Sequence, residues 1–205
     1  MKYIILMVTL FLSAGVSIAK ESEALAPEKE KIDTVIHDLL FNDPASPQIG
    51  AKKAKLTLVN FTDYNCPYCK RLDPLLEKIV QKYPDVAVII KPLPFKGESS
   101  VLSARTALDT WRVNPEKFPD LHANLMEHRG YHTAASVKKA KEKSKIPLVT
   151  LDEKSMDTIK TNLQLARLIG VRGTPATVIG NELVPGAVSW EILEKLVKEK
   201  LAETN

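Results

Sequence analysis

The sequence contains very little cysteine: of 205 residues, two are cysteine, at positions 66 and 69. A structural zinc site needs about four ligands, and no histidine lies near this pair in the sequence, which disfavours zinc. A c-type haem attachment requires histidine directly after the second cysteine, where Lys70 stands. A disulfide closing so small a loop would constrain the unfolded chain little, so it is a poor structural staple. The pair is therefore more readily explained by reactivity than by architecture.

Net charge and long apolar runs are also scarce. The formal charge of +4, which falls to +3 without Lys2, is too small to indicate nucleic-acid binding. One apolar run, from Tyr3 to about Leu12, precedes a small-residue site ending at Ala19, as in a secretory signal peptide. The run is too short to span a bilayer comfortably. We expect cleavage after Ala19 and export into an oxidising compartment, where a disulfide persists; an uncleaved membrane anchor is the alternative.

The two cysteines lie within Cys66-Pro67-Tyr68-Cys69, between a strand-like run and a helix-like run. This context is typical of a thioredoxin-type redox motif. At the first turn of a helix, the Cys66 sulfur faces unpaired N–H groups and the positive end of the helix dipole. Such placement lowers a cysteine pKa from about 8.5 to roughly 3.5–7.5, which favours the reactive thiolate. Cys69, one turn further on, is expected to be more buried and to resolve the mixed disulfide.

An N-terminal extension is predicted at 20–50. Its apolar residues recur with helical spacing and predict an amphipathic helix at about 28–41. This helix either packs on the main body or pairs with a second copy to form a homodimer, and the sequence leaves both open.

Residues 51–205 carry the pattern of a single α/β domain. The predicted elements, in chain order, are a strand at 56–62, a helix at 66–82, a strand at 86–91, a helical stretch at about 98–168, strands at 176–180 and 182–184, and a helix at 189–202. A β-α-β unit followed by helices, a hairpin and a final helix predicts a thioredoxin-like fold with a helical insertion. His122, His128 and His132 do not share one helix face, so we expect them to be surface residues that bind no metal.

A second motif, Gly170-Val171-Arg172-Gly173-Thr174-Pro175, directly precedes an apolar strand, where a tight turn with a cis bond would fall. Together with the cysteine motif, it makes residues 56–201 resemble the DsbA family of bacterial periplasmic thiol:disulfide oxidoreductases. The resemblance implies that Cys66 is an exposed nucleophile and Cys69 the resolving thiol. It also implies that Thr174 and Pro175, beside Pro67 and Tyr68, form the substrate site, with Pro175 cis.

The residues between and before the motifs refine this resemblance. The Pro-Tyr dipeptide and the threonine before Pro175 look more like the isomerase and ScsC-like branches than like the dedicated oxidase, whose usual dipeptide is Pro-His. Relatives often carry a buried acid six residues before the first cysteine, where this chain has Asn60. Since an amide accepts no proton, we expect Cys69 to rely on water or another group.

The sequence thus predicts an enzyme without a cofactor that forms or isomerises disulfides in exported proteins. Its expected partners are unfolded or misoxidised proteins of the periplasm and a membrane redox partner. A different hypothesis is a copper-handling protein that binds Cu(I) through Cys66 and Cys69, since soft thiolates select that metal. A third is an exported interaction protein with an inert disulfide.

Overall fold

The computed structural model describes residues 30–147 and 150–204 of the chain. The predicted signal peptide at 1–19 and the start of the extension lie outside the described residues. The chain divides after Asn42 into two compact parts. In the first part, residues 30–41 are helical, as expected for the described portion of the 28–41 helix. Its apolar residues Ile32 and Val35 are 52% and 57% exposed.

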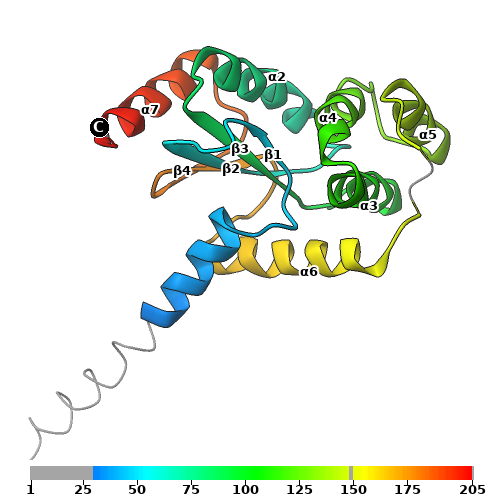
Figure 1. Ribbon diagram of the computed structural model, residues 1–205, viewed down its shortest axis with the longest axis horizontal. Coiled ribbons are helices and arrows are strands. Elements are labelled where there is room, and N and C mark those ends of the chain that lie inside the picture. Colours follow the sequence, from blue (N-terminus) through cyan, green and yellow to red (C-terminus); the bar gives the residue numbers. More distant parts are fainter. Residues whose placement is uncertain (1–29, 148–149, 205) are drawn as a thin grey trace, which may run out of the picture. The chain divides into compact units, whose positions relative to one another are not determined.

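The second part is built on one mixed sheet (Figure 1). Its strands lie in the order β1-β3-β2-β4-β5, with β2 and β3 parallel and the other neighbours antiparallel. Their bounds are Gln48–Gly50 (β1), Leu56–Thr62 (β2), Val86–Pro92 (β3), Ala176–Ile179 (β4) and Glu182–Pro185 (β5). The two parallel strands are almost completely buried, as the continuous apolar run at the start of β3 predicts for that strand. The edge strand β1 was not among the predicted elements, because three residues carry too little pattern.

Helices cover both faces of this sheet (Figure 1). Helices α2 (Pro67–Lys82) and α7 (Trp190–Glu203) lie together on one face, and α6 (Glu153–Leu168) lies on the other. The predicted helical stretch at 98–168 is divided into α3 (Glu98–Val113), the 3-10 turn η1 (Pro115–Lys117), α4 (Phe118–Met126), α5 (Ala134–Lys143) and α6. None of the helices in the described ranges has the length and apolar character that crossing a bilayer requires.

The main apolar core lies between the sheet and helices α2, α4 and α7. From α2 it receives Leu72, Leu76 and Ile79, each at most 1% exposed, which lie at helical spacing on one face. Burying a side chain of this size contributes about 1.5–3 kcal/mol. Pro74 lies inside the same helix. The buried face of α2 therefore fixes how its first turn, with both cysteines, meets the sheet.

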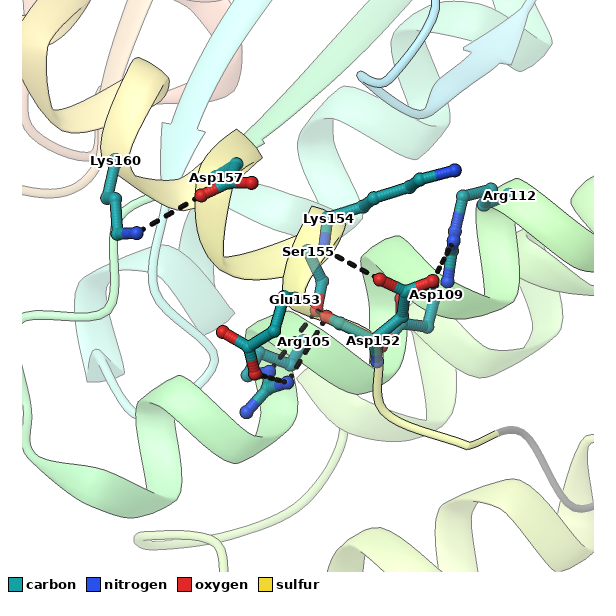
Figure 2. A network of polar contacts seen from close by, with 9 residues as sticks. All are labelled: Arg105, Asp109, Arg112, Asp152, Glu153, Lys154, Ser155, Asp157 and Lys160. Atoms are coloured by element: carbon teal, nitrogen blue, oxygen red, sulfur yellow. Dashed lines mark hydrogen bonds and ion pairs between the residues drawn. The ribbon is translucent and has the colours of Figure 1, made fainter.

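A polar network fixes the start of α6 against α3 (Figure 2). The carboxylate of Asp109, which is completely buried, accepts hydrogen bonds from Arg112 at 2.8 Å and from the backbone N–H of Asp152 at 3.1 Å. Arg105 donates to the carbonyl of Asp152 and to the hydroxyl of Ser155, both at 3.2 Å. This network holds the start of α6, the helix whose other end leads into residues 170–175.

Gly170 ends α6 and turns the chain back toward the sheet. Its φ of +82° lies in the left-handed region that favours glycine. The backbone N–H of Val171 donates to the carbonyl of Ala166 at 2.8 Å, and that of Gly170 donates to Arg167 at 3.2 Å. This is the hydrogen-bonded helix ending that a glycine permits. It directs residues 171–175 toward the first turn of α2.

Candidate active site

Cys66 is the N-cap residue of α2, and Pro67 is its first helical residue. The backbone of Cys66 is extended, with φ −80° and ψ 120°, and its side chain does not cap the helix. Proline fits the first helical position because it has no N–H to leave unpaired and its φ is already helical. The sulfur of Cys66 is therefore placed beside the free N–H groups of the first turn.

The surroundings of Cys66 favour its thiolate. A hydrogen bond from the Cys69 thiol is the largest cause that lowers the pKa of Cys66 from the ordinary 9.0 to about 5. Backbone N–H groups of Tyr68 and Cys69 and the Thr174 hydroxyl lower it further, while burial opposes them. The helix terminus thus contributes as the sequence predicts, but the neighbouring thiol contributes more.

The prediction that Cys66 is exposed is wrong for this structure. The residue is 3% exposed, and its Sγ lies 3.3 Å from the backbone carbonyl oxygen of Thr174, to which the thiol can donate. The structure holds both cysteines as free thiols. Thr174 therefore lies directly against the sulfur of Cys66.

Cys69 has the opposite electrostatic character. It is 1% exposed, and burial is the main cause that raises the pKa of its thiol far above the ordinary value. Its hydrogen bond to Cys66 acts in the same direction, because a donated proton must stay on the donor. The backbone N–H of Asp63 donates to its Sγ at 3.4 Å. The two thiols of one helical turn are therefore distinguished, with Cys66 ionised and Cys69 protonated at neutral pH.

Asp63 is the site residue that the sequence analysis missed. It is 1% exposed, and its carboxylate accepts four hydrogen bonds. The donors are the backbone N–H groups of Asn65, Phe95 and Lys96 and the hydroxyl of Ser100, at 2.7–3.0 Å. It thereby joins the end of β2 to the β3–α3 connection. The bond to Asn65, two residues on, is a local Asx turn and is the one signal that the sequence could have offered.

The Thr174–Pro175 peptide bond is cis, as the resemblance implied. Pro175 is buried, and its carbonyl accepts a hydrogen bond from Gly186 N–H at 2.8 Å. Pro67 and Tyr68 are exposed, and the guanidinium of Arg71 lies 4.5 Å from the centre of the Tyr68 ring. The structure therefore brings Thr174 against Cys66, with Pro67 and Tyr68 at the surface beside them.

Asn60 occupies a buried position in β2. It is 2% exposed, and its amide nitrogen donates to the hydroxyl of Thr177 in β4 at 3.0 Å. Both groups are neutral. This arrangement satisfies the side chain but supplies no proton acceptor at that position.

The expectation that the three central histidines are surface residues is wrong for two of them. His122 and His132 are each 3% exposed. His122 is hydrogen-bonded to Asp73 at 2.7 Å and to the hydroxyl of Tyr64 at 2.9 Å, so it joins α4 to α2 and to the segment before the cysteines. Buried polar groups require such partners. Among the described residues, no three His, Cys, Asp or Glu side chains are grouped to hold a metal ion.

Comparison with known proteins agrees with this geometry. Residues 42–199 match the family described as Thioredoxin. A periplasmic thioredoxin-like protein from Salmonella enterica serovar Typhimurium is 73% identical, with a TM-score of 0.81 over 82% of this chain and 97% of that one. The catalytic domain of Proteus mirabilis ScsC is 54% identical, with a TM-score of 0.80 over 82% and 96% of the two chains. Disulfide bond formation protein D of Bacillus subtilis (strain 168) is 24% identical over 170 residues, which are 76% of this chain and 77% of that protein.

Proposed function

The chain belongs to the thioredoxin family, and from this premise we propose that it is a periplasmic thiol:disulfide oxidoreductase that forms or isomerises disulfides in exported proteins. One observation carries the proposal: Cys66, at the N-cap of α2, stands one helical turn before Cys69, and the pKa of Cys66 is lowered to about 5 whereas that of Cys69 is raised. This pairing gives one nucleophile and one resolving thiol. The periplasmic location is supported by the Salmonella relative, which is a periplasmic thioredoxin-like protein.

Oxidation of a substrate begins from the Cys66–Cys69 disulfide. A substrate thiolate attacks Cys66 Sγ, the S–S bond breaks, and Cys69 leaves as a thiolate that takes up a proton. A second substrate thiolate then attacks the substrate sulfur of the mixed disulfide, and Cys66 leaves as the stabilised thiolate. Two electrons pass from the substrate dithiol to the protein. Isomerisation begins instead from the Cys66 thiolate, which attacks a wrong substrate disulfide and is later displaced by another substrate thiol.

We assign the substrate-binding role to Thr174 and Pro175, flanked by Pro67 and Tyr68. The Thr174 carbonyl lies 3.3 Å from Cys66 Sγ, so a peptide bonded to that sulfur must pass along the Thr174 backbone. An extended peptide can pair with such a backbone as an added strand, which suits any sequence. An enzyme whose substrates are unfolded or misoxidised proteins must bind peptides of many different sequences. A membrane partner that restores the redox state of Cys66 and Cys69 completes the proposed cycle.

The test is equilibration of the protein with glutathione redox buffers, followed by trapping of free thiols. A potential near about −120 mV would indicate a strong oxidant and one near about −270 mV a reductant. Reactivation of a scrambled disulfide protein, compared with oxidation of a reduced one, then separates isomerase from oxidase. Cys66→Ser should abolish both activities. If Cys66→Ser retains exchange with protein substrates, the proposed function is wrong.

The second candidate, Cu(I) handling, is favoured by the two cysteines of one helical turn, whose side chains interact with each other. Soft thiolate pairs select Cu(I). Titration of reduced wild type and of Cys66→Ser with Cu(I), against a competing chelator, tests it. Tight binding that is lost in Cys66→Ser would support copper handling, and equal weak binding by both would exclude it.

A further inference from the structure

The loop that joins α4 to α5, residues 127–133, is tied to the two-cysteine turn by three hydrogen bonds. The ammonium of Lys70, directly after Cys69, donates to the carbonyl oxygens of His128 and Gly130, the latter at 2.7 Å. The side-chain oxygen of Asn65, directly before Cys66, accepts the backbone N–H of His132 at 2.7 Å. Bonds from both sides of the cysteine motif therefore hold this loop beside the active site, although the bonded residues lie 58 to 67 positions apart in the sequence.

The same loop carries an exposed aromatic residue, Tyr131. Among the described residues, the exposed aromatic side chains are Tyr68, Phe95 and Tyr131, with exposures of 55%, 50% and 58%. Each of the three is connected to the site. Tyr68 lies between the cysteines, and the backbone N–H of Phe95 donates to Asp63 at 2.7 Å. Tyr131 directly precedes His132, whose backbone N–H donates to Asn65. Aromatic exposure in the described chain is thus concentrated around Cys66, and exposed apolar groups gathered in one place mark an interaction surface.

The exposed charged residues on the segments that carry these aromatic residues, and on the segment before Pro175, are mostly basic. Exposed cations are Arg71, Lys96, Arg129 and Arg172, and the exposed acids in the same segments are Glu98 and Glu127. A cavity of about 300 Å³ borders the loop, and its lining includes three cations, Arg129, Lys139 and Lys143, with Glu127 as its acid. A partner with aromatic or apolar side chains and negative charge would complement this surface.

We propose that residues 128–132 form a substrate-contacting loop of the redox site and that Tyr131 is a specificity determinant. The favoured substrate is an extended cysteine-containing polypeptide with a large apolar or aromatic residue and an acidic residue close to the reacting cysteine. Lys70 is the positioning residue, because its ammonium fixes the loop backbone that presents Tyr131. This inference rests on the proposed function, since it names the kind of substrate that reaches Cys66.

The experiment measures rates of thiol exchange between the oxidised protein and two kinds of thiol. The first is a set of synthetic peptides with one cysteine, flanked by phenylalanine and glutamate, by phenylalanine and lysine, or by glycine and glutamate. The second is glutathione, which has no aromatic or large apolar side chain to contact Tyr131. The readout is the ratio of each peptide rate to the glutathione rate, so changes in the reactivity of Cys66 itself cancel.

Wild type should prefer the peptide with phenylalanine and glutamate, and this ratio should fall about two- to tenfold in Tyr131→Ala, the range expected for loss of one aromatic contact. Tyr131→Phe should restore most of the ratio. Ile192→Ala is the matched control, because Ile192 is 51% exposed on α7 and has no part in the site; it should leave all rates unchanged. The preference for glutamate over lysine should diminish between about 0.01 M and about 1 M salt, because the screening length falls about tenfold.

Equal ratios in wild type and Tyr131→Ala, or a wild type that does not distinguish the peptides, would overturn the inference while leaving the proposed function intact. If oxidised wild type exchanges with neither peptides nor glutathione, the proposed function itself fails. Lys70→Met tests the positioning role separately. Amide hydrogens of 128–132 should exchange faster in this variant, and the peptide ratio should fall as in Tyr131→Ala; a wild-type ratio despite faster amide exchange would show that the tether has no part in substrate choice.

Discussion

Replacing Cys69 should raise the pKa of Cys66, and the kind of replacement should decide by how much. The hydrogen bond from the Cys69 thiol is the largest cause of the lowered Cys66 pKa, ahead of the N–H groups of the helix start. Cys69→Ala removes this donor and leaves the helix terminus unchanged. Cys69→Ser keeps an O–H donor at nearly the same position. The two variants therefore separate the neighbouring thiol from the helix terminus as the origin of the low pKa.

The size of the effect follows from the energy of one hydrogen bond to a charged group. Such bonds contribute about 1.5–3 kcal/mol, and one pKa unit corresponds to about 1.4 kcal/mol. Loss of the Cys69 donor should therefore raise the pKa of Cys66 from about 5 by about one to two units. At pH 6 the ionised fraction of Cys66, about 90% in the wild type, would fall to between about 10% and 50%. Cys69→Ser should stay within about half a unit of wild type.

The assay is the rate of alkylation of reduced protein across pH 3 to 9, with thiolate absorbance as an independent readout. The midpoint of each profile gives the pKa, and it does not depend on how the intrinsic nucleophilicity of the thiolate changes. Wild type and Cys69→Ser should share a low midpoint, with Cys69→Ala displaced upward. If all three midpoints coincide, the helix terminus alone sets the pKa of Cys66 and the role given to the neighbouring thiol is wrong.

Three further predictions concern stability and turnover. Asp109→Asn should lower the free energy of unfolding by about 2–3 kcal/mol in denaturant titration, because a buried, charged acceptor is lost. The control, Asp157→Asn at the exposed ion pair in Figure 2, should lower it by less than about 1 kcal/mol. Equal losses in the two variants would contradict the importance of burial. Burial lowers the pKa of His132 from 6.5 to about 4. As the pH falls through this interval, His132 therefore binds a proton in the unfolded chain before it does so in the folded protein, and the stability of the fold decreases. His132→Gln should reduce this loss of stability in unfolding midpoints measured from pH 4 to 6.5, whereas His37→Gln, at an exposed histidine, should not. If the stability of His132→Gln still falls with pH as in the wild type, another group causes the effect. Asn60→Asp should speed the resolving step at neutral pH in stopped-flow measurements, and an unchanged rate would show that proton transfer does not limit it.

Most of the sheet and its covering helices could be predicted because their patterns are local. The strand at 56–62 is found with the predicted bounds, and the helix after it ends at Lys82, as predicted. Runs of buried residues and helical spacing reflect which face of each element meets the core. The stretch at 98–168 was predicted only as one long helical region, because the breaks between its helices depend on single residues. Gly130, at φ +77°, and the capping box of Thr133 with Ser136 separate α4 from α5.

The site was predictable where its chemistry lies in adjacent residues and unpredictable where it depends on partners far along the chain. The pair Cys66 and Cys69 and the segment ending at Pro175 carry recognisable spacing. The contacts of Asp63 with residues 95–100 join segments that no local pattern connects. His122 was mistaken for a surface residue for the same reason, since its two partners lie 49 and 58 residues away in the sequence.

The opposite pKa shifts of the two thiols come from one arrangement. Cys69 can donate to Cys66 because its own proton is kept on by burial, and burial of Cys69 requires the first turn of α2 to lie close against the end of β2. Asp63 stabilises this contact between strand and helix. Its N–H donates to Cys69 Sγ, and its carboxylate accepts hydrogen bonds from the β3–α3 connection and the start of α3. A stabilised thiolate on Cys66 makes it a good leaving group, which favours release of oxidised substrate and so makes the disulfide of this pair the more oxidising. We therefore expect the redox potential of the cysteine pair to depend on the contacts that join the strand end to the helix start, as well as on the two residues between the cysteines.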